Sequence, residues 1–274
     1  MALVSLALLL LAHAPVARAA VSPKAAIAAA ACPADARVEV NLAAWKLSLE
    51  QADSAKRRDE LLGELKVALE LPEPATPDAP EARVTLLGIE DEGVALEAGA
   101  RLDHVVQIRF GVESEDAPVH LVQILRPLEG RAFCALGASF ADASDATSKH
   151  ATYDLSFVPL LSAKAVAVEV RRMTATARLS ETRREYWVVR GFTLHKIFDE
   201  ATGHMRSTEG GATTTTVGTL TLAGDFPKRI ELAETTKHGG CEVRAGDAPC
   251  DDGHADATAT TIFVYDGTTY ARRR

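Results

Sequence analysis

The spacing of apolar residues changes at one proline-rich segment, and this change constrains the fold more than any other feature of the chain. Before it, residues 54–70 (SAKRRDELLGELKVALE) place leucines at the spacing of one helical face. After it, apolar and polar residues alternate, as they do in strands with one buried face. The segment itself, LPEPATPDAP (71–80), holds four prolines, which are excluded from helix interiors and central strands. The sequence therefore predicts a helix, a linker over 72–82 and a β domain.

The alternation is regular in the second part of the chain. Val106, Ile108 and Phe110 share one side of a predicted strand, and the same pattern recurs in PVHLVQILR, KAVAVEVRR, REYWVVR, FTLHKIF, TTTVGTLTL and PKRIELAE. Glycine, proline, aspartate and serine separate these short strands, and no second long helical pattern occurs. We expect a mainly β fold, an antiparallel sandwich, barrel or propeller-like sheet, with an N-terminal helical segment. No internal repeat of fixed period is found, which weighs against a true propeller.

These patterns divide the chain into four segments. Residues 1–19 are interpreted as a signal peptide, 20–71 as an alanine-rich lead and helical segment, 72–82 as the linker and 83–274 as the β domain. Ser54 is placed to cap the start of the helix. Trp45 and Leu49 either extend this helix or belong to a preceding one.

The first residues have the features of a secretory signal peptide. Leu3 to Ala12 is an apolar run of about ten residues, too short for a membrane span, which needs about 20. Ala17 and Ala19 then flank Arg18 in a small-x-small cleavage signature. No Lys or Arg precedes the run, so only the amino terminus supplies positive charge there. The sequence predicts a soluble exported protein, periplasmic or secreted, without a membrane span.

The charge balance narrows the class of partner. The chain has 30 Lys and Arg against 38 Asp and Glu, a formal net charge of −8, and removal of Arg18 with the signal peptide gives 29 − 38 = −9. Nucleic acids and anionic membranes are bound through clustered basic residues, so neither is an expected partner. An unidentified protein or glycan is the expected ligand.

Four cysteines, an even number, fit an oxidising compartment, in which cysteines pair. Three connectivities are possible. Cys241 and Cys250 lie close together in CEVRAGDAPC and form the favoured pair, which leaves Cys32 to pair with Cys134 and tie the start of the mature chain to the sheet. The alternative for Cys32 is lipidation after three alanines, which is disfavoured because the usual leucine is absent.

The segment 238–256 raises the question of a metal site. The candidate zinc ligands are His238, Cys241, Cys250 and His254. Their spacing is uncommon for a zinc site, and export favours a disulfide between the two cysteines. The candidate calcium ligands are Asp247, Asp251, Asp252 and Asp256, whose carboxylates offer oxygen atoms. They lack the regular spacing and the distal glutamate of a helix–loop–helix calcium site. We expect no bound metal and no cofactor.

The chain contains no recognisable catalytic motif. It lacks G-x-S-x-G, H-E-x-x-H and a glycine-rich phosphate loop. Seven basic residues lie between 171 and 196: Arg171, Arg172, Arg178, Arg183, Arg184, Arg190 and Lys196. One interpretation is that they form a patch that binds an anionic glycan or an acidic partner. The favoured interpretation is that they pair with nearby carboxylates. The predicted function is a non-catalytic binding or envelope-associated structural module. The alternative is an extracytoplasmic hydrolase whose site is assembled from distant loops.

The chain closes with TIFVYDGTTYARRR (261–274), in which Asp-Gly is typical of a two-residue hairpin turn. Such a turn predicts that Phe263 lies opposite Tyr270 and that Tyr265 lies opposite Thr268. Because both faces of this strand are apolar, we expect the hairpin to lie inside a structure rather than at its rim.

The last fifth of the chain, about 215–272, resembles the closing part of exported bacterial β proteins related to FG-GAP/VCBS-type repeats. The likeness rests on LTLAGDFPKRIELAE and on the ending FVYDGTTY. In such repeats an Asp-rich turn before a strand binds calcium and supports adhesion or ligand recognition. The matching residues are Gly224, Asp225, Ile230, Glu231 and Leu232, whereas Phe226, Pro227 and Lys228 replace the acidic turn. The resemblance implies an exported β protein, and the replaced turn argues against calcium.

Overall fold

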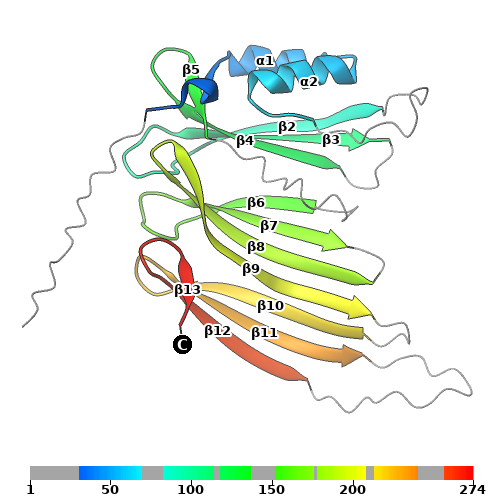
Figure 1. Ribbon diagram of the computed structural model, residues 1–274, viewed down its shortest axis with the longest axis vertical. Coiled ribbons are helices and arrows are strands. Elements are labelled where there is room, and N and C mark those ends of the chain that lie inside the picture. The colour runs from blue at the N-terminus through cyan, green and yellow to red at the C-terminus, as the bar shows by residue number, and fades with distance from the viewer. Residues whose placement is uncertain are drawn as a thin grey trace, which may run out of the picture.

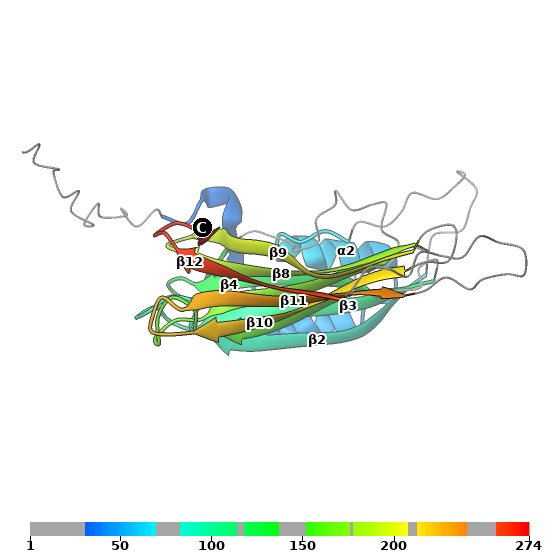
Figure 2. The ribbon, with the colours of Figure 1, turned by 90° about the horizontal axis from the view of Figure 1, so that it is seen from below.

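The computed structural model confirms a mainly β fold with an N-terminal helical segment (Figure 1). It describes residues 31–69, 83–113, 118–136, 152–175, 178–207, 213–239 and 256–273. Within these ranges the strands form two antiparallel sheets. Two helices cover the first sheet on the side away from the second sheet (Figure 1). The strand axes of the two sheets are roughly aligned with each other (Figures 1 and 2).

The first sheet has five strands in the order β1-β5-β4-β3-β2. A short 3-10 helix, Ala34–Ala36, leads into it. The strand bounds are Arg37–Glu39 (β1), Val84–Val94 (β2), Asp103–Val112 (β3), Val119–Pro127 (β4) and Ala132–Ala135 (β5).

The second sheet has eight strands in the order β13-β12-β11-β10-β9-β8-β7-β6, so each strand pairs with the next one along the chain. Their bounds are Thr152–Val158 (β6), Ala167–Ala175 (β7), Leu179–Arg190 (β8), Thr193–Ser207 (β9), Thr213–Ala223 (β10), Arg229–Gly239 (β11), Ala257–Tyr265 (β12) and Tyr270–Arg272 (β13).

The helical segment consists of α1 (Leu42–Glu50) and α2 (Ala55–Glu64), so Trp45 belongs to a separate preceding helix. Ser54 Oγ accepts a hydrogen bond from Arg57 N at 3.2 Å, which confirms the predicted cap of α2. The cap satisfies one of the backbone N–H groups that a helix leaves free in its first turn.

The helix predicted over residues 54–70 ends earlier than expected, at Glu64. Lys66 adopts a left-handed conformation with a φ of 59°, and Val67 N donates to Leu62 O at 3.2 Å. This hydrogen bond pattern is the Schellman motif, which usually has glycine at the left-handed position. The leucine pattern continued past Glu64 because the chain beyond the helix still packs on the same core.

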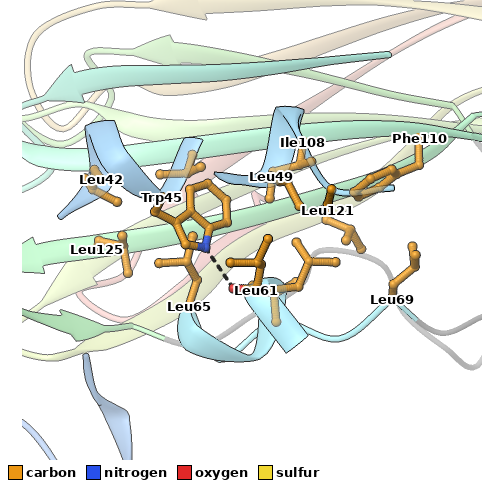
Figure 3. Close-up of a cluster of buried hydrophobic side chains, with 14 of the residues drawn as sticks. Leu42, Trp45, Leu49, Leu61, Leu65, Leu69, Ile108, Phe110, Leu121 and Leu125 are labelled. Atoms are coloured by element: carbon orange, nitrogen blue, oxygen red, sulfur yellow. Dashed lines mark hydrogen bonds between the residues drawn. The ribbon is translucent and has the colours of Figure 1, made fainter. Parts of the chain in front are cut away.

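A first core fills the space between the helices and one face of the first sheet (Figure 3). Trp45 Nε1 donates to Leu61 O at 2.8 Å and fastens α1 to α2, and Gln123 Nε2 donates to Leu65 O at 2.7 Å and fastens the sheet to the end of α2. The labelled side chains converge on this space: Leu42, Trp45, Leu49, Leu61, Leu65, Leu69, Ile108, Phe110, Leu121 and Leu125.

A second core joins the two sheets. Because side chains alternate between the faces of a strand, the residues between those of the first core point to the second sheet. The buried members are Val94, Leu96, Val105, Val122, Ile124, Cys134 and Leu136 from the first sheet region and Val168, Val170 and Val189 from the second. The first sheet therefore packs face to face against the part of the second sheet around β7 and β8.

A buried arginine reinforces this junction. Arg126 donates from Nε and Nη2 to the two carboxylate oxygens of Asp103, at 2.8 and 2.9 Å, and Asp103 is fully buried. Nη1 donates to Glu97 Oε2 at 2.6 Å and to Gly191 O in the turn between β8 and β9. Burial lowers the pKa of Arg126, but the hydrogen bonds and charges of Asp103 and Glu97 outweigh it and raise the pKa overall. One guanidinium thus links both sheets.

A third core forms where the second sheet opens. β9 pairs with β8 from Thr193 to Arg206 but with β10 only from Gly203 to Ser207. The two halves of the sheet therefore separate along the part of β9 that precedes Gly203. Side chains fill the opening: Leu160, Ala167, Tyr186, Val188, Ile197, Phe198, Ile230, Leu232, Phe263 and Tyr270. The ring of Phe198 lies edge-on to those of Phe263 and Tyr270, with centroids 5.1 and 6.3 Å apart.

Candidate binding site

An open concavity of about 280 Å³ lies on the second sheet at the place where β9 and β10 part. The register sets Thr182, Gly203 and Val217 side by side across β8, β9 and β10. Four neighbouring strands, β7 to β10, supply the lining: Arg171, Ser180, Thr182, Arg184, Thr202, Gly203, His204, Met205, Thr215, Thr216, Val217 and Gly218.

Two glycines let the strands approach closely beside the concavity. A Cβ on Gly218 would lie 2.6 Å from the carbonyl oxygen of Thr202 and 2.8 Å from Leu232 Cδ1, closer than real contacts allow. A Cβ on Gly203 would meet the carbonyl oxygen of Thr216 at 3.3 Å. The missing side chains let β9 and β10 approach closely before they diverge, and at Gly203 they leave the floor of the concavity open.

Beside the concavity, Glu169 holds a buried polar network together. Its Oε1 accepts hydrogen bonds from Arg184 Nη1 at 2.6 Å and from the Tyr186 hydroxyl at 3.3 Å, and its Oε2 accepts one from Ser156 Oγ at 2.7 Å. Burial raises the pKa of Tyr186, and the charge of Glu169 raises it further, so the phenol stays protonated and donates. Both carboxylate oxygens are occupied, and Arg184 is held in place at the concavity.

Most of the basic residues between 171 and 196 pair with carboxylates, as the favoured interpretation expected. Arg183 donates to Asp199 at 2.8 Å, and Lys196 Nζ lies 2.7 Å from the other oxygen of Asp199. Burial raises the pKa of Asp199, but the hydrogen bonds from Lys196 and Arg183 outweigh it and lower the pKa overall. The further ion pairs are Arg172–Glu185, Arg184–Glu169 and Lys196–Glu185.

Arg171 is different from these residues. It is exposed and lines the concavity, and its side chain makes no hydrogen bond or ion pair with the rest of the described chain. Asp154 lies opposite it on β6, but beyond ion-pair distance and outside the lining. Arg184 lies opposite it on β8, and its charge is already balanced by Glu169. The concavity therefore carries one guanidinium that a ligand can use.

The lining combines three kinds of contact. A guanidinium binds carboxylates and sulfates with paired hydrogen bonds, hydroxyls bind other hydroxyls, and exposed apolar side chains cover C–H surfaces. The concavity offers all three from Arg171, from Ser180, Thr182 and Thr215, and from Met205 and Val217, which are 40% and 61% exposed.

The histidine in the lining is not placed to act as a general base there. His204 lies between Gly203 and Met205 in β9, so its ring points to the opposite face of the sheet. On that face its Nε2 is 3.3 Å from Thr216 Oγ1, which in turn is 2.9 Å from Thr236 Oγ1. The lining therefore fits binding better than acid–base chemistry.

A histidine–carboxylate pair does occur elsewhere, between the first sheet and α1. His104 Nδ1 lies 2.9 Å from Asp91 Oδ1, and Lys46 Nζ lies 3.0 Å from Asp91 Oδ2. Burial raises the pKa of Asp91, but the hydrogen bonds from His104 and Lys46 outweigh it and lower the pKa overall. The ring of His104 packs against that of Phe133 with centroids 5.5 Å apart. Within the described ranges no serine, threonine or cysteine side chain hydrogen-bonds to His104. The ion pair of Lys46 with Asp91 fastens α1 to the sheet.

The structure joins Cys32 to Cys134 by a disulfide, with an S–S distance of 2.01 Å and a Cα–Cα distance of 5.7 Å. This supports the predicted pairing. Arg37, in the strand that follows Cys32, lies opposite Cys134 in the first sheet. The bond therefore fixes the chain before β1 to the buried side of β5.

The other cysteine pair, Cys241 and Cys250, lies outside the described residues, as do His254 and three of the aspartates of the candidate metal segment: Asp247, Asp251 and Asp252. His238, at the end of β11, and Asp256, before β12, are exposed. In the parts of the chain that are described, no three His, Cys, Asp or Glu side chains gather as a metal site would require.

In the turn that carries the resemblance to calcium-binding repeats, the ammonium group of Lys228 lies over the turn. Lys228 Nζ donates to Gly224 O at 3.1 Å and lies 4.8 Å from the centre of the Phe226 ring. Glu231 is engaged by Arg229 at 2.5 Å. Lys228 and Arg229 thus place two basic groups at this turn.

The closing hairpin differs from its predicted form. Tyr265 lies opposite Tyr270, and Phe263 lies opposite Arg272, so the loop has four residues instead of two. The reason is Asp266, whose Oδ1 accepts hydrogen bonds from the backbone N–H groups of residues 268 and 269 and thereby stabilises the wider turn. The expected position inside a structure is also wrong, because β12 and β13 form the rim of the second sheet.

Comparisons with protein-family models, with curated proteins and with solved structures each found no match. The likeness to FG-GAP/VCBS-type repeats therefore stays a hypothesis. Neither helix in the described ranges has the length and apolar character of a membrane span. The properties of the concavity are the basis on which a function can be proposed.

Proposed function

We propose that the protein is an exported, non-catalytic binding module that holds an acidic glycan on the open face of its second sheet. The observation that carries this proposal is the exposed Arg171, which has no counterion among the described residues and lines a concavity rich in hydroxyl groups. A uronic acid presents the matching chemistry, with a carboxylate, several hydroxyls and an apolar C–H face.

Export, to the periplasm or the cell exterior, is part of the proposal. It is supported by the features of residues 1–19 and by the disulfide between Cys32 and Cys134, because such bonds persist in oxidising compartments. An intact mass of the protein isolated from its host tests this part. A chain that starts at Ala20 and lacks four hydrogens agrees with export and two disulfides, whereas an unprocessed chain with free thiols contradicts it.

The ligand is tested by calorimetric titration with hexagalacturonate, with an uncharged hexasaccharide as the control ligand. We expect the acidic oligosaccharide to bind and the uncharged one to bind at least tenfold more weakly. Arg171→Gln should weaken binding of hexagalacturonate about tenfold or more, since hydrogen bonds to charged groups contribute about 1.5–3 kcal/mol. Binding should also weaken at high salt.

Arg229→Gln is the matched control, because Arg229 is exposed but already paired with Glu231 outside the concavity. It should leave the affinity unchanged. An equal loss in both variants would mean that only the overall charge matters. Failure of the parent protein to bind either oligosaccharide would overturn the proposed ligand.

The alternative function, an extracytoplasmic hydrolase, would have to use a base such as His104, which is paired with Asp91. A panel of ester and glycoside substrates tests it. Turnover that disappears in His104→Ala, while the thermal stability is kept, would favour the hydrolase over the binding module.

A further inference from the structure

A second basic side chain without a counterion among the described residues lies beside the concavity. Lys237, near the end of β11, is exposed, and its side chain makes no hydrogen bond or ion pair with the rest of the described chain. In the register of the strands, Lys237 lies opposite Thr215, and Thr215 lies opposite Met205. Because Thr215 and Met205 both line the concavity, Lys237 is the next residue beyond its lining on the β11 side.

The register also shows that Lys237 and Arg171 point to the same side of the second sheet. Residues directly opposite each other in an antiparallel sheet share a face, and so do residues two apart in one strand. The row that starts at Lys237 crosses four further strands, with Thr215, Met205, Ser180 and Ala175. Ala175 is four residues from Arg171 in β7, which pairs with β8 without a shift. Both cations therefore project from the face that holds the concavity.

The two cations lie on opposite sides of the concavity. Arg171 belongs to β7 and Lys237 to β11, four strands further on in the sheet (Figure 1). Since neighbouring strands are about 4.8 Å apart, the two positions are on the order of 20 Å apart. Hydroxyl groups, apolar side chains and the open floor at Gly203 occupy the space between them.

Carboxylates of the protein do not occupy this space. Among the described residues, the lining of the concavity includes no Asp or Glu. Glu200 lies opposite Arg184 in β9, but it is outside the lining and pairs with Arg272 at 3.8 Å. Asp256, before β12, makes no ion pair with Lys237. The face between the two cations is therefore open to the acid groups of a ligand.

Two cations at this separation select for the length of a ligand. One carboxylate cannot contact both of them, whereas a linear chain with an acid group on each unit presents a carboxylate to each. Once the first carboxylate is bound at Arg171, the contact at Lys237 is intramolecular and raises the affinity without a larger pocket. The units between them meet the hydroxyl and apolar side chains of the lining.

We propose that the ligand of the concavity is a linear acidic polysaccharide that crosses strands β7 to β11 obliquely, with one carboxylate at Arg171 and a later one at Lys237. The inference rests on the proposed function. It adds the polymeric nature of the ligand, its course over the sheet and a second charged contact. Thr182, Gly203 and Thr215 lie along this course.

Calorimetric titration with digalacturonate and with hexagalacturonate tests the course. We expect the parent protein to bind the hexasaccharide at least fivefold more tightly than the disaccharide, because only the longer chain reaches both cations. Lys237→Gln should weaken binding of the hexasaccharide about three- to fivefold and leave binding of the disaccharide unchanged. Lys237→Arg should retain the affinity. Arg171→Gln should weaken binding of both.

Lys56→Gln is the matched control. Lys56 is an exposed lysine of α2, on the side of the first sheet away from the second, and its replacement changes the net charge equally (Figure 1). It should leave both affinities unchanged. Equal weakening by Lys56→Gln and Lys237→Gln, or equal affinity of the parent for both oligosaccharides, overturns this inference and leaves the proposed function standing.

Two other outcomes overturn the proposed function together with this inference. One is failure of the parent protein to bind either acidic oligosaccharide. The other is tighter binding of hexaglutamate than of hexagalacturonate, since the peptide presents carboxylates without the hydroxyl groups of a sugar and would identify an acidic protein as the ligand.

Discussion

At Gly218 the backbone of β10 passes closer to β9 than any side chain would permit. The residue has ordinary surroundings in the sequence, where it interrupts a run of threonines, valine and leucines. Its importance comes from the carbonyl oxygen of Thr202, which belongs to the backbone and cannot rotate away. One missing methyl group therefore permits the close approach of β10 to Thr202 beside the concavity.

Gly218→Ala should lower the free energy of unfolding by about 1–3 kcal/mol, because the new Cβ overpacks against Thr202 and Leu232. Urea denaturation measures the change. Gly63→Ala is the control, since nothing lies within 4 Å of a Cβ at this position of α2, and alanine favours the helix. It should stabilise the protein by about 0.5–1 kcal/mol. Similar effects of the two substitutions would contradict the role assigned to Gly218.

At the scale of single elements, strands could be located from the sequence because their signal is local. The alternation of Val106, Ile108 and Phe110 with Gln107 and Arg109 indicates that the valine, isoleucine and phenylalanine side of β3 is buried. The signal does not say what covers each side, and here both sides are covered, by helices on one and by the second sheet on the other. The division into two sheets was therefore not predictable from periodicity.

The candidate site was predictable only in part, for the same reason. The sequence located a basic stretch, but whether an arginine is paired depends on the neighbouring strand. Arg184 meets Glu169 in β7, whereas Arg171 meets no carboxylate at ion-pair distance. The hairpin was mispredicted because the Asp266 side chain, rather than the Asp-Gly dipeptide, determines the loop length.

The junction of β3, β4 and the β8–β9 turn gives a prediction at the element scale. Asp103→Asn keeps the shape of the side chain but removes the charge that balances the buried Arg126. We expect a loss of about 3–5 kcal/mol in the free energy of unfolding. Glu90→Gln breaks the exposed pair with Arg109 and should cost less than about 1 kcal/mol. Equal losses, measured by urea denaturation, would contradict a role for burial.

At the scale of the whole molecule, two kinds of link hold the layers together. Three apolar cores lie between the helices and the first sheet, between the two sheets and in the opening of the second sheet. The disulfide adds a covalent link between the chain before β1 and β5, across a sequence separation of 102 residues. A link that closes so long a loop restricts the unfolded chain strongly.

Replacing both Cys32 and Cys134 by serine should lower the free energy of unfolding by about 4–5 kcal/mol, because the unfolded chain regains the freedom of the open loop. Guanidinium denaturation of the oxidised protein and the double variant measures the difference. The double replacement of Cys241 and Cys250, which the sequence predicts to close a short loop, should cost less. A larger effect of the second pair would contradict this ranking.

The third core has a consequence for the order in which the protein can fold. Phe198 is shielded by Phe263 and Tyr270, which are synthesised much later. Until those residues emerge and β12 joins the sheet, the apolar side of β8 and β9 stays open to water. Contacts so distant along the chain form slowly, and exposed strands of this kind aggregate. The apolar side of β8 and β9 can therefore be covered only after the last two strands of the chain have been synthesised.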